Sequence, residues 1–291
     1  MADRPQPTFR HRQLLSELRR LRDASGMTLE QVGKEMGVSG ATVSRIETAQ
    51  VRPKLRDIQA LLDIYQVKGE RKRQSLLQLT RDLGKKGWWN QYTDTLSGPY
   101  LEYISLEGDA VSLGTYEPQM VHGLLQTENY TRAMADEARS RLSADRLDAI
   151  IAAREARKSV LHRADQPTSF DVVLDEAVIR RMVGGPSVMR EQLLHLVELS
   201  EQPNIELQVL PFQAGAPTWI GGPFALLEFA TPADLWIVYV ENMTDGLYLE
   251  DDDKVGRYRD AFHQLRTAAL DPEQSKSLIL ATAKTLEGPT T

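Results

Sequence analysis

Residues 28–47 read TLEQVGKEMGVSGATVSRIE, and this stretch decides the fold of the N-terminal part of the chain. Thr28, followed by Gln31 three residues later, has the form of a capping box at the start of a short helix. Gly37 supplies the sharp turn that ends that helix. Ser39 is a favourable N-cap for a second helix. The stretch therefore predicts two short helices joined by a tight turn.

Gly33 lies in the middle of the first of these helices. Glycine in a helix interior costs about 1 kcal/mol relative to alanine, so its presence calls for a reason. We interpret it as a point of close contact, where a small residue lets the two helices cross without a side-chain clash.

The flanking segments complete a helical module. Apolar residues recur at helical spacing from Leu14 to Leu21 and stop at Gly26, and the helical period returns in residues 54–65. We expect four short helices packed as an all-α domain over residues 10–68.

Charge divides the chain more sharply than its average suggests. The overall net charge is -6, but residues 1–86 contain 18 Lys and Arg against 10 Asp and Glu, a net of +8, and the remainder carries -14. A basic module attracts phosphate, whereas an acidic body repels it. Chance clustering of solvated charge is the alternative explanation.

Composition narrows the class of protein further. With 291 residues, of which 41% are hydrophobic and 26% charged, the chain is expected to form about two globular domains. Its apolar runs fall far short of the roughly 20 residues of a membrane span, and residues 1–9 lack the apolar core of a signal peptide. The absence of cysteine excludes disulfides and thiolate chemistry. We expect a cytoplasmic, nucleoid-associated protein without membrane contact.

The segments 28–39 and 41–47 resemble the XRE helix-turn-helix family, which includes Cro and phage repressors. The resemblance implies that the second helix of the motif enters the major groove of double-stranded DNA. The positions expected to face bases are Ser39, Gly40, Ala41, Thr42, Ser44 and Arg45. Arg45 is the strongest candidate, because a guanidinium can pair with O6 and N7 of guanine.

Four further residues are candidates for phosphate contact: Thr28, Gln31, Arg52 and Lys54. Helix N-termini and nearby cations bind anions, although plain solvent exposure is the alternative for each. The family resemblance also implies a structural ion pair between Arg22 and Glu47, whose disruption would destabilise the module.

Residues 69–99 are expected to connect two domains. Leucines at helical intervals in residues 76–83 predict a connecting helix, and an aromatic cluster of Trp88, Trp89 and Tyr92 follows. Such a cluster more often docks one domain on another than stacks on bases.

The remaining residues, 100–285, alternate between strand-like and helix-like patterns. Strands are expected at residues 111–116, 170–174, 205–210, 224–229 and 235–240, and helices at residues 127–138, 145–161, 176–183, 187–200 and 255–270. The successive late strands favour an α+β domain with a mostly antiparallel sheet, so that the whole chain is a multi-domain protein.

The segments 116–127, 175–184 and 205–211 resemble the large C-terminal domain of antitoxin-like XRE regulators of actinobacteria. One departure is His122, where the resemblance leads us to expect proline. The resemblance implies a regulator controlled by a small protein partner encoded nearby, and it identifies no binding residues.

No pattern typical of catalysis is found. The five histidines are scattered without the spacing of a metal site, and the acidic run at residues 250–253 lacks the alternation of an EF-hand. We therefore predict no catalytic residue, no metal, no cofactor and no enzymatic activity. The aromatic residues Trp219, Phe224, Trp236 and Tyr239 either fill a core or line a pocket for a small-molecule effector.

Taken together, these features favour a homodimeric, sequence-specific transcriptional regulator, in which two recognition helices engage adjacent half-sites. The first alternative is an antitoxin-like protein-interaction module with weak or non-specific DNA binding, which the small side chains of Gly40 and Ala41 support. A second alternative, an enzyme with a DNA-targeting domain, requires an active-site constellation that the sequence does not show.

Overall fold

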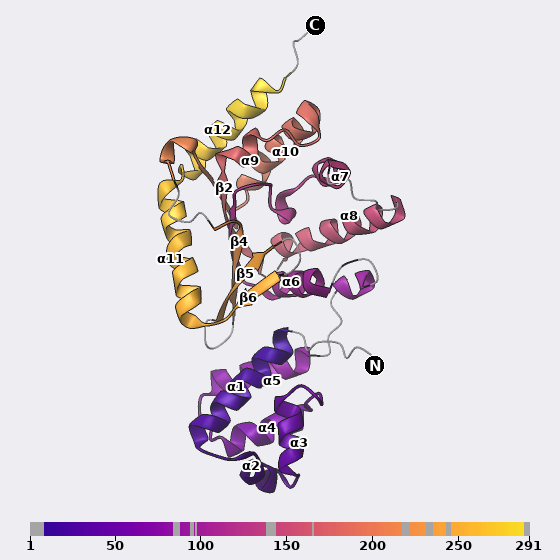
Figure 1. Cartoon of the computed structure of the whole chain (residues 1–291), viewed down its shortest axis with the longest axis vertical. Helices are drawn as coiled ribbons and strands as arrows, with labels where there is room; N and C mark the ends of the chain where they lie inside the picture. The colour runs from indigo at the N-terminus through magenta and orange to yellow at the C-terminus, as the bar shows by residue number, and fades with distance from the viewer. Residues whose placement is uncertain are drawn as a thin grey trace. The chain divides into compact units, whose positions relative to one another are not determined.

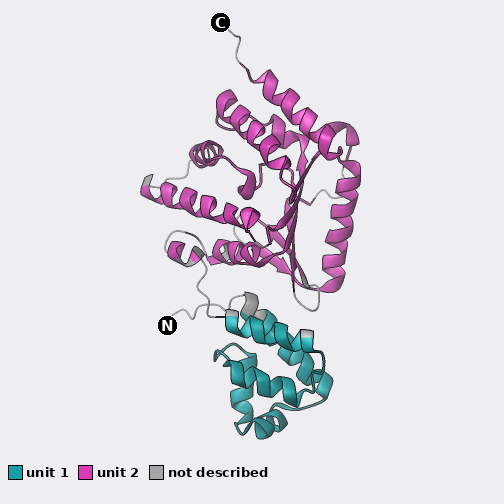
Figure 2. Cartoon of the chain, turned by 180° about the vertical axis from the view of Figure 1, so that it is seen from behind, with its two compact units in different colours: residues 1–87, 231–234 teal, residues 88–230, 235–291 magenta. Residues whose placement is uncertain are grey.

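The computed structural model describes residues 9–83, 88–93, 96, 98–137, 144–164, 166–216, 221–230, 235–242 and 246–287. Two compact units are separated along the chain (Figure 2). Unit 1 contains the described residues up to Leu83, and unit 2 contains those from Trp88 onward.

Unit 1 is entirely helical in its described residues (Figure 1). Its helices are α1 (Phe9–Ser25), α2 (Leu29–Met36), α3 (Gly40–Glu47), α4 (Leu55–Ile64) and α5 (Glu70–Asp82). They enclose one core whose fully buried members include Leu14, Leu18, Val32, Val43 and Ile58. Each of these lies on the apolar stripe that the sequence period predicts, so burial of these stripes holds the module together.

Helix α5 also belongs to this core. Leu76 and Leu77 are buried in the same cluster as the leucines of α1. The segment 69–99, expected as one connection, is thus divided: its helix packs within unit 1, and its aromatic residues begin unit 2. Burial of apolar surface explains why α5 packs in unit 1. A helix with a continuous apolar stripe is more stable when that stripe covers a core than when the helix is a solvent-exposed connection between domains.

The turn between α2 and α3 forms as the sequence predicts. Thr28 and Gln31 make a reciprocal capping box, and Gly37 adopts the left-handed conformation with φ of 69°. A Cβ at Gly33 would lie 2.8 Å from both the Gly40 amide nitrogen and the Val38 carbonyl oxygen. This close approach confirms the interpretation of Gly33, since any side chain would force the turn away from α2.

Unit 2 is built on a six-stranded mixed sheet with the order β3-β2-β1-β4-β5-β6. The strands are β1 (Ser112–Glu117), β2 (Ser169–Asp175), β3 (Ile205–Leu210), β4 (Phe224–Phe229), β5 (Leu235–Glu241) and β6 (Gly246–Leu249). Strands β1, β2 and β3 run parallel, whereas β1 with β4, β4 with β5 and β5 with β6 are antiparallel. The expected α+β fold with a mostly antiparallel sheet is confirmed.

Helices cover both faces of this sheet (Figure 1). They are η1 (Trp88–Tyr92), α6 (Gly98–Asp109), η2 (Gly123–Leu125), α7 (Glu128–Glu137), α8 (Ala144–Lys158), η3 (Ser159–His162), α9 (Glu176–Arg180), α10 (Gly185–Ser200), η4 (Phe212–Ala214), α11 (Asp252–Ala268) and α12 (Pro272–Thr285). Helix α11 lies along one face, where Phe262 packs against Tyr116, Phe224 and Leu226. Helices α6, α7, α8 and α10 lie on the opposite side of the sheet in Figure 1.

Among the described α-helices and strands of unit 2, α6, β6 and α12 were not expected from sequence. Strand β6 has only four residues and pairs on one side only, and α6 contains Gly98, Pro99 and Gly108, so neither has a strong local signal. Tertiary contacts stabilise them instead, as when Trp89 of η1 lies over Gly108, 3.2 Å from the position of its missing Cβ. Among the described residues, no helix is both long and apolar enough to cross a membrane.

Candidate DNA-binding surface and interior cavity

The N-terminus of α3 is held by its own side chains. The backbone N–H of Thr42 donates to Ser39 Oγ at 3.2 Å, and the two hydroxyl oxygens lie 3.0 Å apart. Ser39, Ala41 and Arg45 are exposed, and Thr42 and Ser44 are half-buried. Five of the six positions expected to face bases therefore present a side chain at or near the surface of α3.

Arg45 extends along its own helix. Its Nε donates to the Ala41 carbonyl oxygen at 3.3 Å, and its Nη2 donates to Thr42 Oγ1 at 3.3 Å. Both bonds are near the upper limit of hydrogen-bond length, and the side chain is exposed. The guanidinium can therefore exchange these contacts for a base edge or a phosphate at little cost.

Gly40 differs from the other five positions. A Cβ there would lie 3.1 Å from the Glu30 amide nitrogen and 3.2 Å from its Cα, so the position faces the first turn of α2. Only the backbone of Gly40 is available to a ligand. Its small size serves the crossing of α2 and α3, and does not by itself indicate that specific DNA recognition has been lost.

The four candidate phosphate ligands are all exposed. Thr28 and Gln31 bond each other in the capping box, with Thr28 N–H donating to Gln31 Oε1 at 2.8 Å. Lys54 is the N-cap residue of α4, and Arg52 precedes it in the loop after α3. Two of these residues thus stand at the N-terminus of α2 and one at that of α4, where the helix dipole favours an anion.

Arg22 and Glu47 are in contact, joining α1 to the last residue of α3. Arg22 Nε donates to Glu47 Oε1 at 2.9 Å, and the Glu47 side chain is only 5% exposed. Arg19, which the sequence does not single out, adds a bond from its Nε to the Glu47 carbonyl oxygen at 2.9 Å. Two arginines therefore fix the C-terminal end of α3 against α1.

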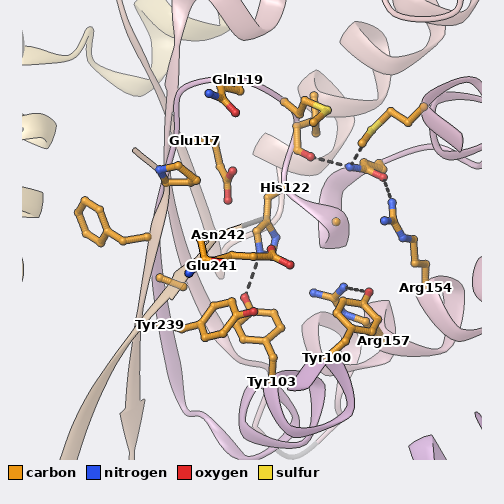
Figure 3. Close-up of a pocket in the computed structure, with 18 residues that line it drawn as sticks. Tyr100, Tyr103, Glu117, Gln119, His122, Arg154, Arg157, Tyr239, Glu241 and Asn242 are labelled. Carbon is orange, nitrogen blue, oxygen red and sulfur yellow. Dashed lines mark hydrogen bonds between the residues drawn. The ribbon is translucent and has the colours of Figure 1, made fainter. Parts of the chain in front are cut away.

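Unit 2 contains a cavity of about 630 Å³ on the side of the sheet that faces α6 and α8 (Figure 3). Tyr100 and Tyr103 reach it from α6, Arg154 and Arg157 from α8, and Tyr239 and Glu241 from the end of β5. Glu117 at the end of β1 and His122 before η2 complete the polar lining. Its size is within the range of cavities that hold small molecules.

One wall of the cavity rests on a buried ion pair. Arg157 donates from Nη2 and Nε to the two carboxylate oxygens of Glu107, at 2.6 and 2.9 Å, and the two side chains are 4% and 0% exposed. The guanidinium also lies over the rings of Tyr100 and Tyr103, at 5.3 and 5.5 Å from their centroids. The charge of Arg157 is thus neutralised within the protein, and the pair holds α8 against α6.

His122 is neutral and fixed. Burial, together with the charges of Arg157 and Arg154, holds its pKa well below the usual range. Its Nδ1 accepts from the Leu124 N–H at 3.3 Å, which assigns the ring proton to Nε2, 3.2 Å from the Tyr103 hydroxyl. The residue that stands in place of an expected proline therefore caps η2 and orients Tyr103.

Glu117 is the least satisfied group of the cavity. The carboxyl makes no hydrogen bond or ion pair within the part of the chain that the structure describes. Burial and the neighbouring carboxylate of Glu241 raise the pKa of Glu117 to about 8, against a smaller opposing effect of Arg157. At neutral pH this carboxyl is largely protonated, because burial and the Glu241 carboxylate outweigh the opposing charge of Arg157.

The family models fit this division of the chain. A family described as a domain of unknown function, DUF5753, matches residues 100–281, which is more than half of the chain. The chain belongs to the DUF5753 family. A second model, described as a helix-turn-helix domain, matches residues 13–75 and so covers α2, the turn and α3. No curated protein and no solved structure matches the chain.

The aromatic residues expected at a core or an effector pocket are divided between two faces of the DUF5753 domain. Tyr239 lines the cavity, whereas the ring of Phe224 lies on the opposite face of the sheet, with its centroid 6.3 Å from that of Phe262 in α11. Trp236 faces α11, where the Arg259 guanidinium lies 4.7 Å from its ring centroid. Trp219 lies outside the described residues.

The charged residues of the DUF5753 cavity were not found by sequence reasoning. Glu117, Arg154 and Arg157 come from segments that are far apart along the chain and resemble ordinary solvated charge. Among the described residues, no group of three or more His, Cys, Asp or Glu side chains is arranged to hold a metal ion. The arrangement is suited to binding an organic ligand through charge, hydroxyl groups and aromatic surface.

Proposed function

We propose that this DUF5753 protein is a sequence-specific transcriptional regulator of the XRE type whose affinity for DNA is controlled through its C-terminal domain. The helix-turn-helix domain indicates a DNA-binding regulator. The observation that carries the finer proposal is the exposed face of α3, where Arg45 stands on a helix held rigidly at both ends. The proposal assigns the chain a binding role and no catalytic reaction.

In this proposal Arg45 reads a base in the major groove, while Thr28, Gln31, Arg52 and Lys54 bind phosphates and set the register. The net charge of +8 on residues 1–86 supports that orientation, because the rest of the chain is acidic. A homodimer would place two copies of α3 on half-sites about one helical turn of DNA apart.

Control requires a ligand with different affinities for the DNA-competent and DNA-incompetent states. The resemblance to antitoxin-like regulators supports a small protein partner, and the cavity of the DUF5753 domain supports a small molecule. Both would act on the same equilibrium.

The test is selection of binding sites from random duplex DNA by the full chain, followed by titration of the selected site at several salt concentrations. We expect a recurrent two-fold motif. Arg45→Ala should relax the preference at one base pair, by about 1–3 kcal/mol, and leave the others unchanged. Lys54→Ala should weaken binding to all DNA sequences similarly. It should also reduce the slope of log affinity against log salt concentration by about 1.

Equal loss on every sequence for Arg45→Ala would contradict the assignment of base reading to this residue. Selection without any recurrent motif would favour the interaction module over the regulator. Light scattering of the complex tests the dimer, because binding of a single copy to the selected site contradicts it.

A further inference from the structure

The register of the sheet places two carboxylates side by side at the mouth of the cavity. Thr115, Ala225 and Tyr239 occupy one row across β1, β4 and β5. Strands β1 and β5 run in the same direction. Two residues further along them, the next row on the same face consists of Glu117, Pro223 and Glu241. Because side chains alternate between faces, Glu117 and Glu241 share the face of Tyr239.

Three strands at a spacing of about 4.8 Å put the backbones of Glu117 and Glu241 about 10 Å apart. Two glutamate side chains can reach across such a gap to a cation between them. Pro223, which lies between them, has no N–H to offer either carboxylate. Figure 3 shows both side chains directed toward the same space beside His122.

The neighbouring surface is aromatic and rigid. The rings of Tyr103 and Tyr239 stack with their centroids 4.4 Å apart, and both line the cavity. The phenol of Tyr103 is further fixed by His122. Aromatic faces beside carboxylates favour an ammonium group attached to an apolar body, since ring and charge contribute together.

The opposite side of the cavity offers a donor. Arg154 Nη1 donates to Gln126 Oε1, but the Arg154 Nε is buried and has no hydrogen-bond partner among the described residues. A buried N–H without a partner costs about 1–3 kcal/mol. Arg154 lines the cavity, so an oxygen atom of a ligand there would lie beside its positive charge.

We propose that this cavity binds a small organic amine, with its ammonium group between the carboxylates of Glu117 and Glu241, its body on the Tyr103 and Tyr239 rings, and an oxygen acceptor toward Arg154. This inference rests on the proposed function only where it concerns the effect of the bound amine on the affinity of the chain for DNA. Binding of the amine requires the charged form of Glu117, so a proton leaves this carboxyl when the ligand enters near neutral pH.

The first experiment measures binding of tyramine, octopamine and dopamine, each beside its N-acetylated counterpart, to the full chain without DNA by isothermal titration calorimetry. We expect at least one amine to bind, and to bind at least tenfold more tightly than its acetylated form. The proposal is overturned if no amine binds, or if the acetylated forms bind equally well.

Three variants locate the site for the amine that binds. Glu117→Gln and Glu241→Gln retain the size of the side chain, and each should weaken binding at least tenfold while the thermal unfolding curve remains cooperative. Glu198→Gln on α10, whose side chain is 79% exposed and lies outside the cavity, is the matched control and should bind normally. Unchanged binding by both cavity variants contradicts the site.

The pH profile separates a charge contact from simple packing. The charged and titratable groups around Glu117 are Glu241 from β5, Arg154 and Arg157 from α8, His122 before η2, and the phenols of Tyr100, Tyr103 and Tyr239. Of these, His122 is held neutral and burial raises the pKa of the Tyr103 and Tyr239 phenols, so the Glu117 carboxyl is the group expected to dominate the pH dependence between pH 6 and 8. Affinity should rise several-fold over this interval in the wild type and stay flat in Glu117→Gln.

A final measurement tests separately whether the amine binds in the cavity and whether its binding changes the affinity of the chain for DNA. The bound amine is added to the complex with the selected DNA, and the dissociation constant for DNA is measured. Amine binding without any change in DNA affinity leaves the site intact and contradicts ligand control. DNA binding by a chain that binds no amine contradicts the site and leaves the regulator intact.

Discussion

The exposed face of α3, which we propose binds DNA, and the cavity of the DUF5753 domain are built in opposite ways. The first comes from one continuous stretch, in which caps and glycines set the backbone and small exposed side chains face outward. The second is assembled from α6, β1, η2, α8 and β5, and one of its walls is fixed by the buried ion pair of Arg157 with Glu107. A surface made by local rules tolerates substitution of its exposed residues, whereas a cavity made by tertiary contacts depends on each buried partner.

The largest expected effect is at the base of the cavity. Arg157→Ala leaves the Glu107 carboxylate, which is 0% exposed, without its partner, and should destabilise unit 2 by about 3–5 kcal/mol. Arg22→Ala should cost less, because the Arg22 side chain is 18% exposed and water can reach the site. Chemical denaturation of each variant measures the difference. Equal losses of stability in Arg157→Ala and Arg22→Ala would contradict the idea that the cavity depends more strongly on its buried ion pair than unit 1 does on its own.

A smaller loss is expected where α2 meets the turn. Gly33→Ala places a methyl group 2.8 Å from the backbone of Gly40 and should destabilise unit 1 by about 1–3 kcal/mol. Gly256→Ala in α11 is the matched control, because no atom lies within 4 Å of its Cβ position and the change should stabilise by about 0.4–1 kcal/mol. A neutral Gly33→Ala would contradict the close contact.

The buried carboxyl of the cavity makes stability depend on pH. The pKa of Glu117 is raised to about 8 in the folded chain. The stability that the protonated carboxyl contributes is therefore fully present below its ordinary pKa and is lost as pH rises through about 8. Glu117→Gln removes this dependence. Between pH 5 and 9 the free energy of unfolding of the variant should rise by about 1–2 kcal/mol relative to the wild type, a value reduced because the Glu117 side chain is only half-buried. Thermal unfolding across that range measures it. A constant difference between the two proteins contradicts the raised pKa.

The smallest effect is expected at the cap of α3. Ser39→Ala removes the oxygen that accepts from the Thr42 N–H and should destabilise unit 1 by about 1 kcal/mol. Affinity should fall to a similar degree for all DNA sequences, since the hydroxyl orders the helix rather than reading a base. Loss confined to one base pair would instead assign Ser39 to direct recognition.

Local signals predicted much of the fold. Strands β3 and β4 lie at the residues expected, because β3 alternates apolar residues with Glu206 and Gln208, β4 is a short and mostly apolar run, and a proline lies beside each. The capping box at Thr28 and the role of Gly33 were predicted for the same reason. Gly40 shows the limit of this reasoning: its place in the motif suggested a base-facing position, but its packing against Glu30 depends on the crossing of two helices.

The cavity could not be predicted because burial of charge leaves no mark in the local sequence. Helix α8 carries Asp, Arg, Glu and Lys around its circumference, and nothing in its pattern distinguishes the buried Arg157 from its solvated neighbours. The partner Glu107 is 50 residues away along the chain. Only the topology of the sheet, which brings the ends of β1 and β5 into one row, reveals the paired carboxylates.

Helix α5 has a consequence for how the two units communicate along the chain. Leu76 and Leu77 are buried with Leu14 and Leu18, so the last described helix of unit 1 cannot be displaced without opening the core beneath the DNA-binding surface. A force on the chain at the C-terminal end of α5 would therefore act on the hydrophobic packing of unit 1 before it reached any residue proposed to contact DNA.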